Sequence, residues 1–243
     1  MLKNDLVYFR KTTLVDYPEK VAAAIFFRPC NLRCPWCHNG SLITINEAQN
    51  DDSQMTAIED ALDHIKKRAG VLDGVVLSGG EPAMYGSLEE LVAEIKNQSL
   101  SVKLDTNGTV PRVLAGLLQS DMPPDFIAMD LKVSPARYKT LSPAHKEFEN
   151  EIRESARLIR EAWENGRIQA EFRSLALPRL FFGENDIEEL SALAGGVPWV
   201  IRPFRPGSCL DPSWNNEIET TDMELKKLSE FARNTAKTRG RHG

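Results

Sequence analysis

Three cysteines crowd into one short stretch of the sequence, Cys30-x3-Cys34-x2-Cys37. Thiolates are soft ligands that suit iron–sulfur clusters and zinc. Three thiolates on one loop can each bind one iron of a four-iron, four-sulfur cube, which leaves the fourth iron without a protein ligand. An open iron has little use in an electron carrier, but a substrate can bind to it. The spacing therefore predicts a catalytic [4Fe–4S] cluster.

Two other interpretations of the cysteines stay open. A structural zinc site normally takes four protein ligands. The candidates for the fourth are His38, which is adjacent to Cys37 and poorly placed to close a tetrahedron, and Cys209, which lies far along the chain. The cysteines could also be inert core residues, although the polar neighbours Asn31 and Arg33 argue against that. A non-catalytic, metal-binding interaction module is thus the alternative from a different functional class.

The elements that must position these cysteines alternate between strands and helices. Short apolar runs predict strands at residues 21–27, 74–77, 101–104, 126–129, 168–175 and 199–203. Amphipathic runs predict helices at 56–69, 88–97, 110–118, 147–163, 186–193 and 221–236. The polar stretch 46–54 predicts a loop. This alternation favours a parallel sheet, and six such units suit a partial (β/α) barrel or a doubly wound sheet.

Chemically unusual residues follow or end the predicted strands. They are the cysteine triplet, Gly79-Gly80-Glu81-Pro82, Asp105-Thr106-Asn107-Gly108, Asp130-Leu131-Lys132, Arg173, and the pair Arg202 and Arg205. Because the carboxyl ends of parallel strands share one rim, where sites are built, we expect these residues to meet there.

At this point the sequence resembles the radical S-adenosylmethionine (SAM) superfamily. A Cys-x3-Cys-x2-Cys triplet with an aromatic residue, here Trp36, before its last cysteine is the signature of these enzymes. Longer stretches are similar to the activating enzymes of glycyl-radical proteins. The nearest likeness is to short anaerobic ribonucleoside-triphosphate reductase activating proteins, followed by pyruvate formate-lyase activating enzymes. These stretches are residues 12–18, 37–39, 78–82, 103–108, 128–132 and 202–207, and the likeness spans about 8–231.

The resemblance implies an α/β fold, a partial (β/α)6 TIM-like barrel. It implies a single radical SAM domain over residues 1–243, with a core at about 8–207 and a C-terminal helix at about 221–236. The implied cofactors are a [4Fe–4S] cluster on Cys30, Cys34 and Cys37 and S-adenosyl-L-methionine. The implied reaction is reductive cleavage of SAM to a 5′-deoxyadenosyl radical that takes a hydrogen from a glycine of a partner enzyme. We expect anaerobic ribonucleotide reductase as that partner and flavodoxin as the electron donor.

The resemblance also assigns residues to SAM. The residues expected to bind it are Trp36, Gly79, Gly80, Glu81, Asp105, Thr106, Lys132 and Arg205. A monovalent cation is expected between Asp105, Thr106 and Asp130, because two carboxylates that converge on a cleft repel each other unless a cation intervenes. Structural alternatives remain: Trp36 could anchor its loop, Lys132 could simply pair with Asp130, and the Asp105–Gly108 segment could be an ordinary turn.

Arg205 departs from the pattern of the family, and Arg173 has two alternative roles. In the pyruvate formate-lyase activating group a histidine usually occupies the place of Arg205. Arginine cannot act as a base, which argues against pyruvate formate-lyase as the partner. Arg173 and Arg202 could bind the SAM carboxylate or only cap the rim of the barrel.

Composition and charge exclude several other classes of protein. The chain has 243 residues, 42% of them hydrophobic, and a net charge of −5, which suits one sizeable core and argues against nucleic-acid binding. No apolar run approaches the ~20 residues that cross a bilayer, and the first residues lack the core of a signal peptide. We therefore expect a cytoplasmic protein without a membrane partner. A radical SAM enzyme acting on a small molecule, as in deazaguanine-forming synthases, remains the other enzymatic alternative.

Overall fold

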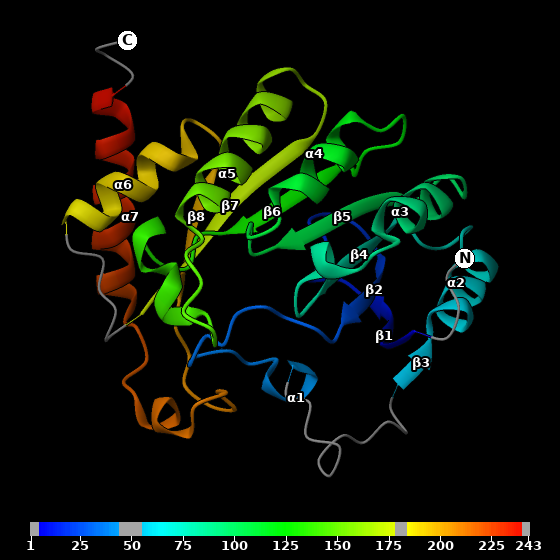
Figure 1. The fold of residues 1–243 in the computed structure, drawn as a ribbon, viewed down its shortest axis with the longest axis horizontal. Coiled ribbons are helices and arrows are strands. Elements are labelled where there is room, and N and C mark those ends of the chain that lie inside the picture. Colours follow the sequence, from blue (N-terminus) through cyan, green and yellow to red (C-terminus); the bar gives the residue numbers. More distant parts are fainter. Residues whose placement is uncertain (1–4, 44–54, 178–183, 240–243) are drawn as a thin grey trace.

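A single mixed sheet forms the centre of the computed structural model, which describes residues 5–43, 55–177 and 184–239 (Figure 1). The strand order is β3-β1-β2-β4-β5-β6-β7-β8. The parallel strands are β2 (Ala22–Phe27), β4 (Gly74–Gly79), β5 (Ser101–Thr106), β6 (Phe126–Asp130), β7 (Gln169–Ala176) and β8 (Trp199–Pro203). They confirm the six predicted strands and their parallel pairing. The predicted loop 46–54 lies outside the described residues.

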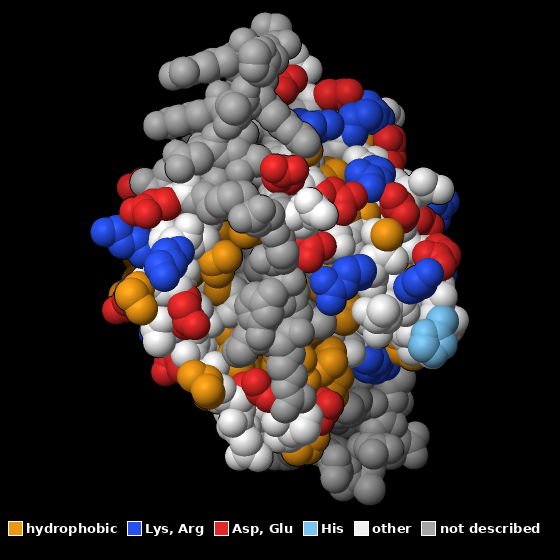
Figure 2. All heavy atoms as spheres, turned by 90° about the vertical axis from the view of Figure 1, so that its left-hand side faces the viewer, with side chains coloured by type: hydrophobic (Ala, Val, Ile, Leu, Met, Phe, Trp, Pro, Cys, Tyr) orange, Lys and Arg blue, Asp and Glu red, His pale blue; other side chains and the backbone are white. Residues whose placement is uncertain are grey.

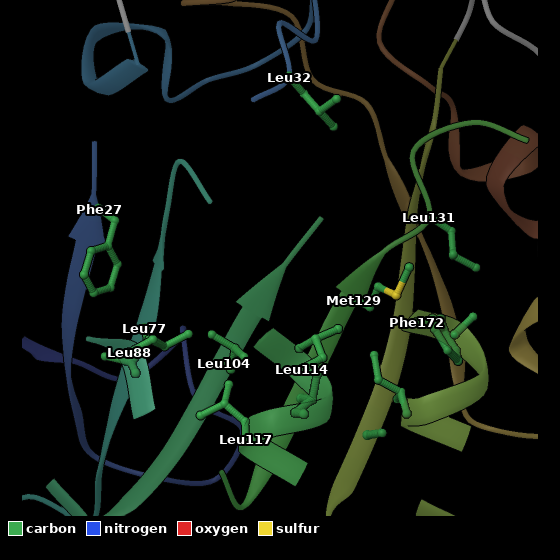
Figure 3. Packing of buried hydrophobic residues seen from close by; sticks show 14 of the residues in the cluster. Phe27, Leu32, Leu77, Leu88, Leu104, Leu114, Leu117, Met129, Leu131 and Phe172 are labelled. Carbon is green, nitrogen blue, oxygen red and sulfur yellow. The ribbon is translucent and has the colours of Figure 1, made fainter. Parts of the chain in front are cut away.

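Helices follow the parallel strands and pack against one face of the sheet. The longer ones are α2 (Ile58–Lys67), α3 (Leu88–Lys96), α4 (Pro111–Gln119), α5 (Glu149–Glu164), α6 (Glu184–Ala194) and α7 (Asp222–Arg239). The short segments are α1 (Gly40–Ile43), η2 (Pro82–Met84), η3 (Pro135–Leu141) and η4 (Pro212–Asn216). Figure 3 shows Leu77, Leu104 and Met129 from neighbouring strands beside Leu114 and Leu117 of α4. Burying each such side chain stabilises the fold by about 1.5–3 kcal/mol.

Strand β2 shows how the sequence fixes the two faces of the sheet. Successive side chains of a strand point to opposite faces. Ala23, Ile25 and Phe27 belong to the core between the sheet and the helices, whereas Ala22 and Ala24 belong to a smaller apolar cluster. Both faces of this strand are therefore buried, which explains why it is an unbroken apolar run.

The two strands that the sequence did not predict lie at one edge of the sheet. β1 (Leu6–Thr13) pairs antiparallel with β2, and β3 (Met55–Ala57) pairs antiparallel with β1. The second half of β1 is polar, with Arg10, Lys11 and Thr12 exposed and Thr13 buried, so it lacks the apolar run of a buried strand. The helix predicted from residue 56 begins at Ile58 because Met55–Ala57 is used in this pairing.

The described surface carries charges of both signs. In Figure 2 the acidic and basic side chains of the described residues are interspersed rather than gathered by sign. On α5, Arg153 is bonded to Glu149 and to Glu189 of α6. Among the described helices, none combines the length and apolarity needed to span a membrane.

Candidate active site

A pocket of about 550 Å³ opens where the parallel strands end. Its size is within the range of small-molecule and cofactor sites. The predicted residues that line it are Cys30, Cys34, Trp36, Cys37, Gly79, Gly80, Asp105, Thr106, Asp130 and Lys132. The fold thus brings together, on one rim, residues that are separated by up to 102 positions in the sequence.

The cysteine loop folds back on itself within the wall of this pocket. The amide of Cys37 donates to the carbonyl of Cys34 at 3.0 Å, and the Arg33 guanidinium donates to the carbonyl of Cys30 at 2.7 Å. All three cysteines are free thiols. Burial raises the pKa of Cys34 to about 12 and also raises the pKa of Cys30. Metal binding must therefore displace protons from these thiols, since a coordinated thiol is deprotonated.

The cysteine geometry does not form a closed zinc site. Within the described ranges, no three or more His, Cys, Asp or Glu side chains form a group that could hold one metal ion. His38 instead donates through Nε2 to the carbonyl oxygen of Arg205 at 3.0 Å. Three separate thiols around one pocket fit a cube, in which each sulfur binds a different iron.

A later segment of the chain holds the cysteine loop from the outside (Figure 1). The amides of Leu210 and Asp211 donate to the carbonyls of Cys37 and Pro35, both at 2.9 Å. The ring of Trp36 packs against Trp214 with centroids 5.3 Å apart and is 5% exposed. These contacts favour loop anchoring as a role of Trp36, although part of its side chain also lines the pocket.

Gly79 and Gly80 are needed because the chain entering the cysteine loop lies against them. Gly79 has a φ of +107°, and a Cβ there would lie 2.5 Å from the backbone nitrogen of Phe27. A Cβ on Gly80 would lie 2.3 Å from the carbonyl oxygen of Pro29. The sequence predicted that these glycines admit a ligand; the structure shows first that they admit a neighbouring backbone.

The Glu81 side chain, which the resemblance assigned to SAM, is not among the residues that line the pocket. It is completely buried, and its carboxylate accepts from the Ala83 amide at 3.0 Å, the Thr106 hydroxyl at 2.7 Å and the Asn107 amide at 2.6 Å. Burial raises its pKa to about 7, and these three hydrogen bonds oppose that shift. Glu81 therefore ties the loop after β4 to the loop after β5.

A side-chain cation lies between the two carboxylates for which a free cation was predicted. The Arg173 guanidinium is 2.9 Å from Asp130 and 3.3 Å from Asp105. Lys103 pairs with Asp105, and Lys132 lies 3.2 Å from Asp130. Desolvation opposes ionisation of Asp130, but Arg173 and Lys132 outweigh it and lower the pKa to about 2. Arg173 thus supplies the positive charge that the repulsion between the two carboxylates requires.

Arg205 lies apart from the predicted set. Its side chain is 75% exposed, is 3.3 Å from Glu219 and is not among the pocket-lining residues. Its backbone carbonyl contacts the cysteine segment, because it accepts a hydrogen bond from His38. Arg202 does line the pocket and lies 3.7 Å from Glu171.

Sequence reasoning missed the contacts of two polar residues of the β5 segment, Lys103 and Asn107. Lys103 is 2% exposed in β5, and an isolated lysine in a buried strand was a usable signal. Asn39, which lies in one of the stretches that resemble the family, donates through its side-chain amide to the carbonyl of Gly79 at 3.0 Å. Asn107 was treated as part of a turn, yet its side chain approaches Cys30. No sequence pattern indicates which of these contacts the fold will create.

Comparison with known proteins connects this site with a family. The model of the Radical SAM superfamily matches residues 24–191. A Methanocaldococcus jannaschii protein, provisionally named a glycyl-radical enzyme activating enzyme, is 28% identical over 228 residues, which covers 90% of this chain and 88% of that protein. A pyruvate formate-lyase-activating enzyme of Staphylococcus aureus is 32% identical over 108 residues, 44% of this chain and 43% of its own.

A solved structure supports the same architecture. The radical SAM methyltransferase of Sphaerobacter thermophilus matches with a TM-score of 0.63 at 16% identity, covering 90% of this chain. This chain spans 65% of that protein's length, and at such identity the likeness concerns the fold alone. The unclosed parallel sheet is therefore a partial TIM-like barrel, as predicted.

Proposed function

The chain belongs to the radical SAM superfamily, whose enzymes use a [4Fe–4S] cluster and SAM, and from this premise we propose that it activates a glycyl-radical enzyme. The proposed substrate is one glycine of an anaerobic ribonucleotide reductase, from which a hydrogen atom is removed. The observation that carries the proposal is that three free cysteines line a pocket of about 550 Å³ at the strand ends. The likeness to the Methanocaldococcus protein over nine-tenths of the chain supports the type of partner.

The proposed cluster ligands are Cys30, Cys34 and Cys37. They leave one iron for the amino and carboxylate groups of SAM. When bound and reduced by one electron, the cluster supplies the chemistry that splits SAM into methionine and a 5′-deoxyadenosyl radical. Flavodoxin is the proposed electron donor, and a reducing compartment such as the cytoplasm suits the free thiols.

Charged residues of the pocket fit the charges of SAM. We assign Lys132 and Arg173 to the SAM carboxylate, because both cations line the pocket. Asp105 and Asp130 hold these cations in place and also attract the positive sulfonium and ammonium groups. Gly80 lines the pocket with backbone atoms alone.

The shape of the sheet supports a polypeptide substrate. Within the described residues its strand order begins at β3 and ends at β8, so these strands do not enclose the pocket in a full ring. Arg10 of β1 and Arg202 of β8 both line the pocket, one from each side of this incomplete barrel. A loop carrying the target glycine can therefore approach between them.

Electron spin resonance tests the proposal directly. The reconstituted, oxygen-free enzyme is mixed with SAM, reduced flavodoxin and an anaerobic ribonucleotide reductase, and the electron spin resonance spectrum of the mixture is recorded. We expect a glycyl-radical doublet that disappears when the target glycine is replaced by alanine or when Cys34→Ser enzyme is used. If 5′-deoxyadenosine forms but no doublet appears, the reductase is not the partner and a small-molecule substrate gains support.

A further inference from the structure

Asn107 belongs to a closed ring of side-chain hydrogen bonds beside Cys30. Its amide nitrogen donates to Oδ1 of Asn31 at 3.1 Å, and the amide of Asn31 donates to the hydroxyl of Thr109 at 2.7 Å. The Thr109 hydroxyl then donates to Oδ1 of Asn107 at 2.6 Å. Asn107 and Thr109 are each 4% exposed, so water competes little for these bonds.

The ring fixes which way the Asn107 amide faces. Its Oδ1 accepts from both the hydroxyl and the backbone amide of Thr109, the latter at 2.9 Å, which uses both lone pairs. Its two amide hydrogens must therefore face the other way, where one donates to Asn31 and the other points to Sγ of Cys30 at 3.9 Å. The backbone amide of Asn107 is also bonded to Glu81 at 2.6 Å. Rotating the side chain would break several bonds at once.

We propose that Asn107 is a positioning residue for the iron–sulfur cluster, whose amide donates to the sulfur of Cys30 and thereby raises the reduction potential of the cluster. The backbone amide of Leu32 is a second donor to the same sulfur, at 3.5 Å. Hydrogen bonds to a ligating sulfur withdraw electron density from the iron, so they favour the reduced cluster. This inference rests on the proposed role of Cys30 as a cluster ligand, but not on the identity of the partner protein.

The consequence concerns how easily the cluster accepts its electron. A cluster with a higher potential is more often reduced at a given potential of the electron donor. The donor to Cys30 directly follows Asp105 and Thr106, the last residues of β5, which line the pocket. The end of β5 therefore shapes both the SAM side of the pocket and the electronic state of the cluster.

Potentiometric titration of the full-length, reconstituted enzyme tests this, with the reduced cluster followed by electron spin resonance in the absence of SAM. Asn107→Asp keeps an acceptor for Thr109 but loses both donors, and the neutral Asn107→Ser controls for the added charge. At the wild-type midpoint we expect the ratio of reduced to oxidised cluster to fall about tenfold in Asn107→Asp, which corresponds to about 59 mV for a one-electron couple. Asn107→Ser should shift in the same direction. Thr109→Val removes the hydroxyl from the ring but keeps the backbone amide of Thr109 as a donor to Oδ1 of Asn107, so its shift should be smaller than that of Asn107→Asp.

A second measurement does not depend on the potential. In enzyme labelled with ¹⁵N-asparagine, electron–nuclear double resonance should detect a nitrogen coupled to the reduced cluster in the wild type, and Asn107→Ser should lose this coupling while signals from Asn31 and Asn39 remain. Unchanged potentials in both Asn107 variants, an equal shift in Thr109→Val, or the absence of ¹⁵N coupling would overturn the inference. Iron and sulfide content is measured on every sample. Wild-type protein that binds no cluster would instead overturn the proposed function.

Discussion

Replacing Arg173 by methionine removes the cation that lies between two carboxylates of the pocket. The guanidinium side chain is 13% exposed and lies 2.9 Å from Asp130 and 3.3 Å from Asp105. Methionine keeps much of the apolar stem but no charge. Asp105 and Asp130 are then left facing each other, with Lys103 and Lys132 as their remaining partners.

The magnitude follows from the pKa of Asp130 and the burial of Asp105. The pKa of Asp130 falls from 3.8 to about 2, because Arg173 and Lys132 outweigh desolvation. That shift corresponds to about 2.5 kcal/mol, and the 35% exposure of the Asp130 side chain reduces it to about 1–2 kcal/mol. Losing the hydrogen bond to Asp105 adds about 1–2 kcal/mol. We expect Arg173→Met to lower the free energy of unfolding by about 2–4 kcal/mol at neutral pH.

The pH dependence of this loss distinguishes charge from packing. A carboxyl whose pKa is lowered by folding stabilises the protein above its unfolded pKa of 3.8, so the wild type keeps this stabilisation throughout the mildly acidic range. In the variant, repulsion raises the pKa of one carboxyl, which then takes up a proton as the pH falls. The stability difference should therefore shrink as the pH falls from neutral toward the unfolded pKa of 3.8.

Urea unfolding in oxygen-free buffer, followed by circular dichroism, measures this difference. The double variant Arg173→Met with Asp130→Asn removes one of the repelling carboxylates and should recover part of the loss. Arg173→Lys controls for charge without the planar fork of donors. A loss below about 0.5 kcal/mol, the size of an ordinary surface substitution, would refute the reasoning, as would a larger loss that does not change with pH.

Three further changes have defined outcomes. Gly80→Ala should lower the melting temperature and the cluster content, because its Cβ would lie 2.3 Å from the carbonyl oxygen of Pro29, whereas Gly86→Ala, with no atom within 4 Å of its Cβ, should change neither. The pKa of Glu81 is raised from 4.5 in the unfolded chain to about 7 in the folded protein, so the stability of the wild type should decline as the pH rises from about 5 to about 8. Glu81→Gln should flatten this decline. Urea unfolding across this pH range measures the slope. Arg205→Ala should leave the rate of SAM cleavage within about twofold of wild type, since its side chain is exposed and does not line the pocket.

The sequence predicted the rim of the site well because strand periodicity and strand polarity are local properties. An apolar run followed by unusual residues indicates a buried strand and the loop at its carboxyl end. Parallel pairing then brings the cysteine loop, the loop after β4 and the loop after β5 together. This reasoning needs no knowledge of side-chain direction, which is why most of the rim residues that it named line one pocket.

Side-chain direction was not predictable from the sequence. Glu81 follows the end of β4, and Asp105 lies at the end of β5. Both carry carboxylates, but Glu81 is buried in the protein behind the pocket and Asp105 lines the pocket. The partner of the two pocket carboxylates is Arg173, from a strand later in the chain. Such choices depend on contacts between distant segments. The edge strands β1 and β3 were missed for a related reason, because β1 is largely exposed at its polar end and does not form an apolar run.

Formation of 5′-deoxyadenosine by the oxygen-free, reconstituted protein tests the central claim most directly. The sample is treated with SAM and dithionite, and 5′-deoxyadenosine and methionine are quantified alongside iron. We predict about four irons per chain, with both products formed in equal amounts, and neither product from Cys34→Ser. Wild-type protein that holds its cluster but releases no 5′-deoxyadenosine would contradict the account, as would a Cys34→Ser variant that is as active as the wild type.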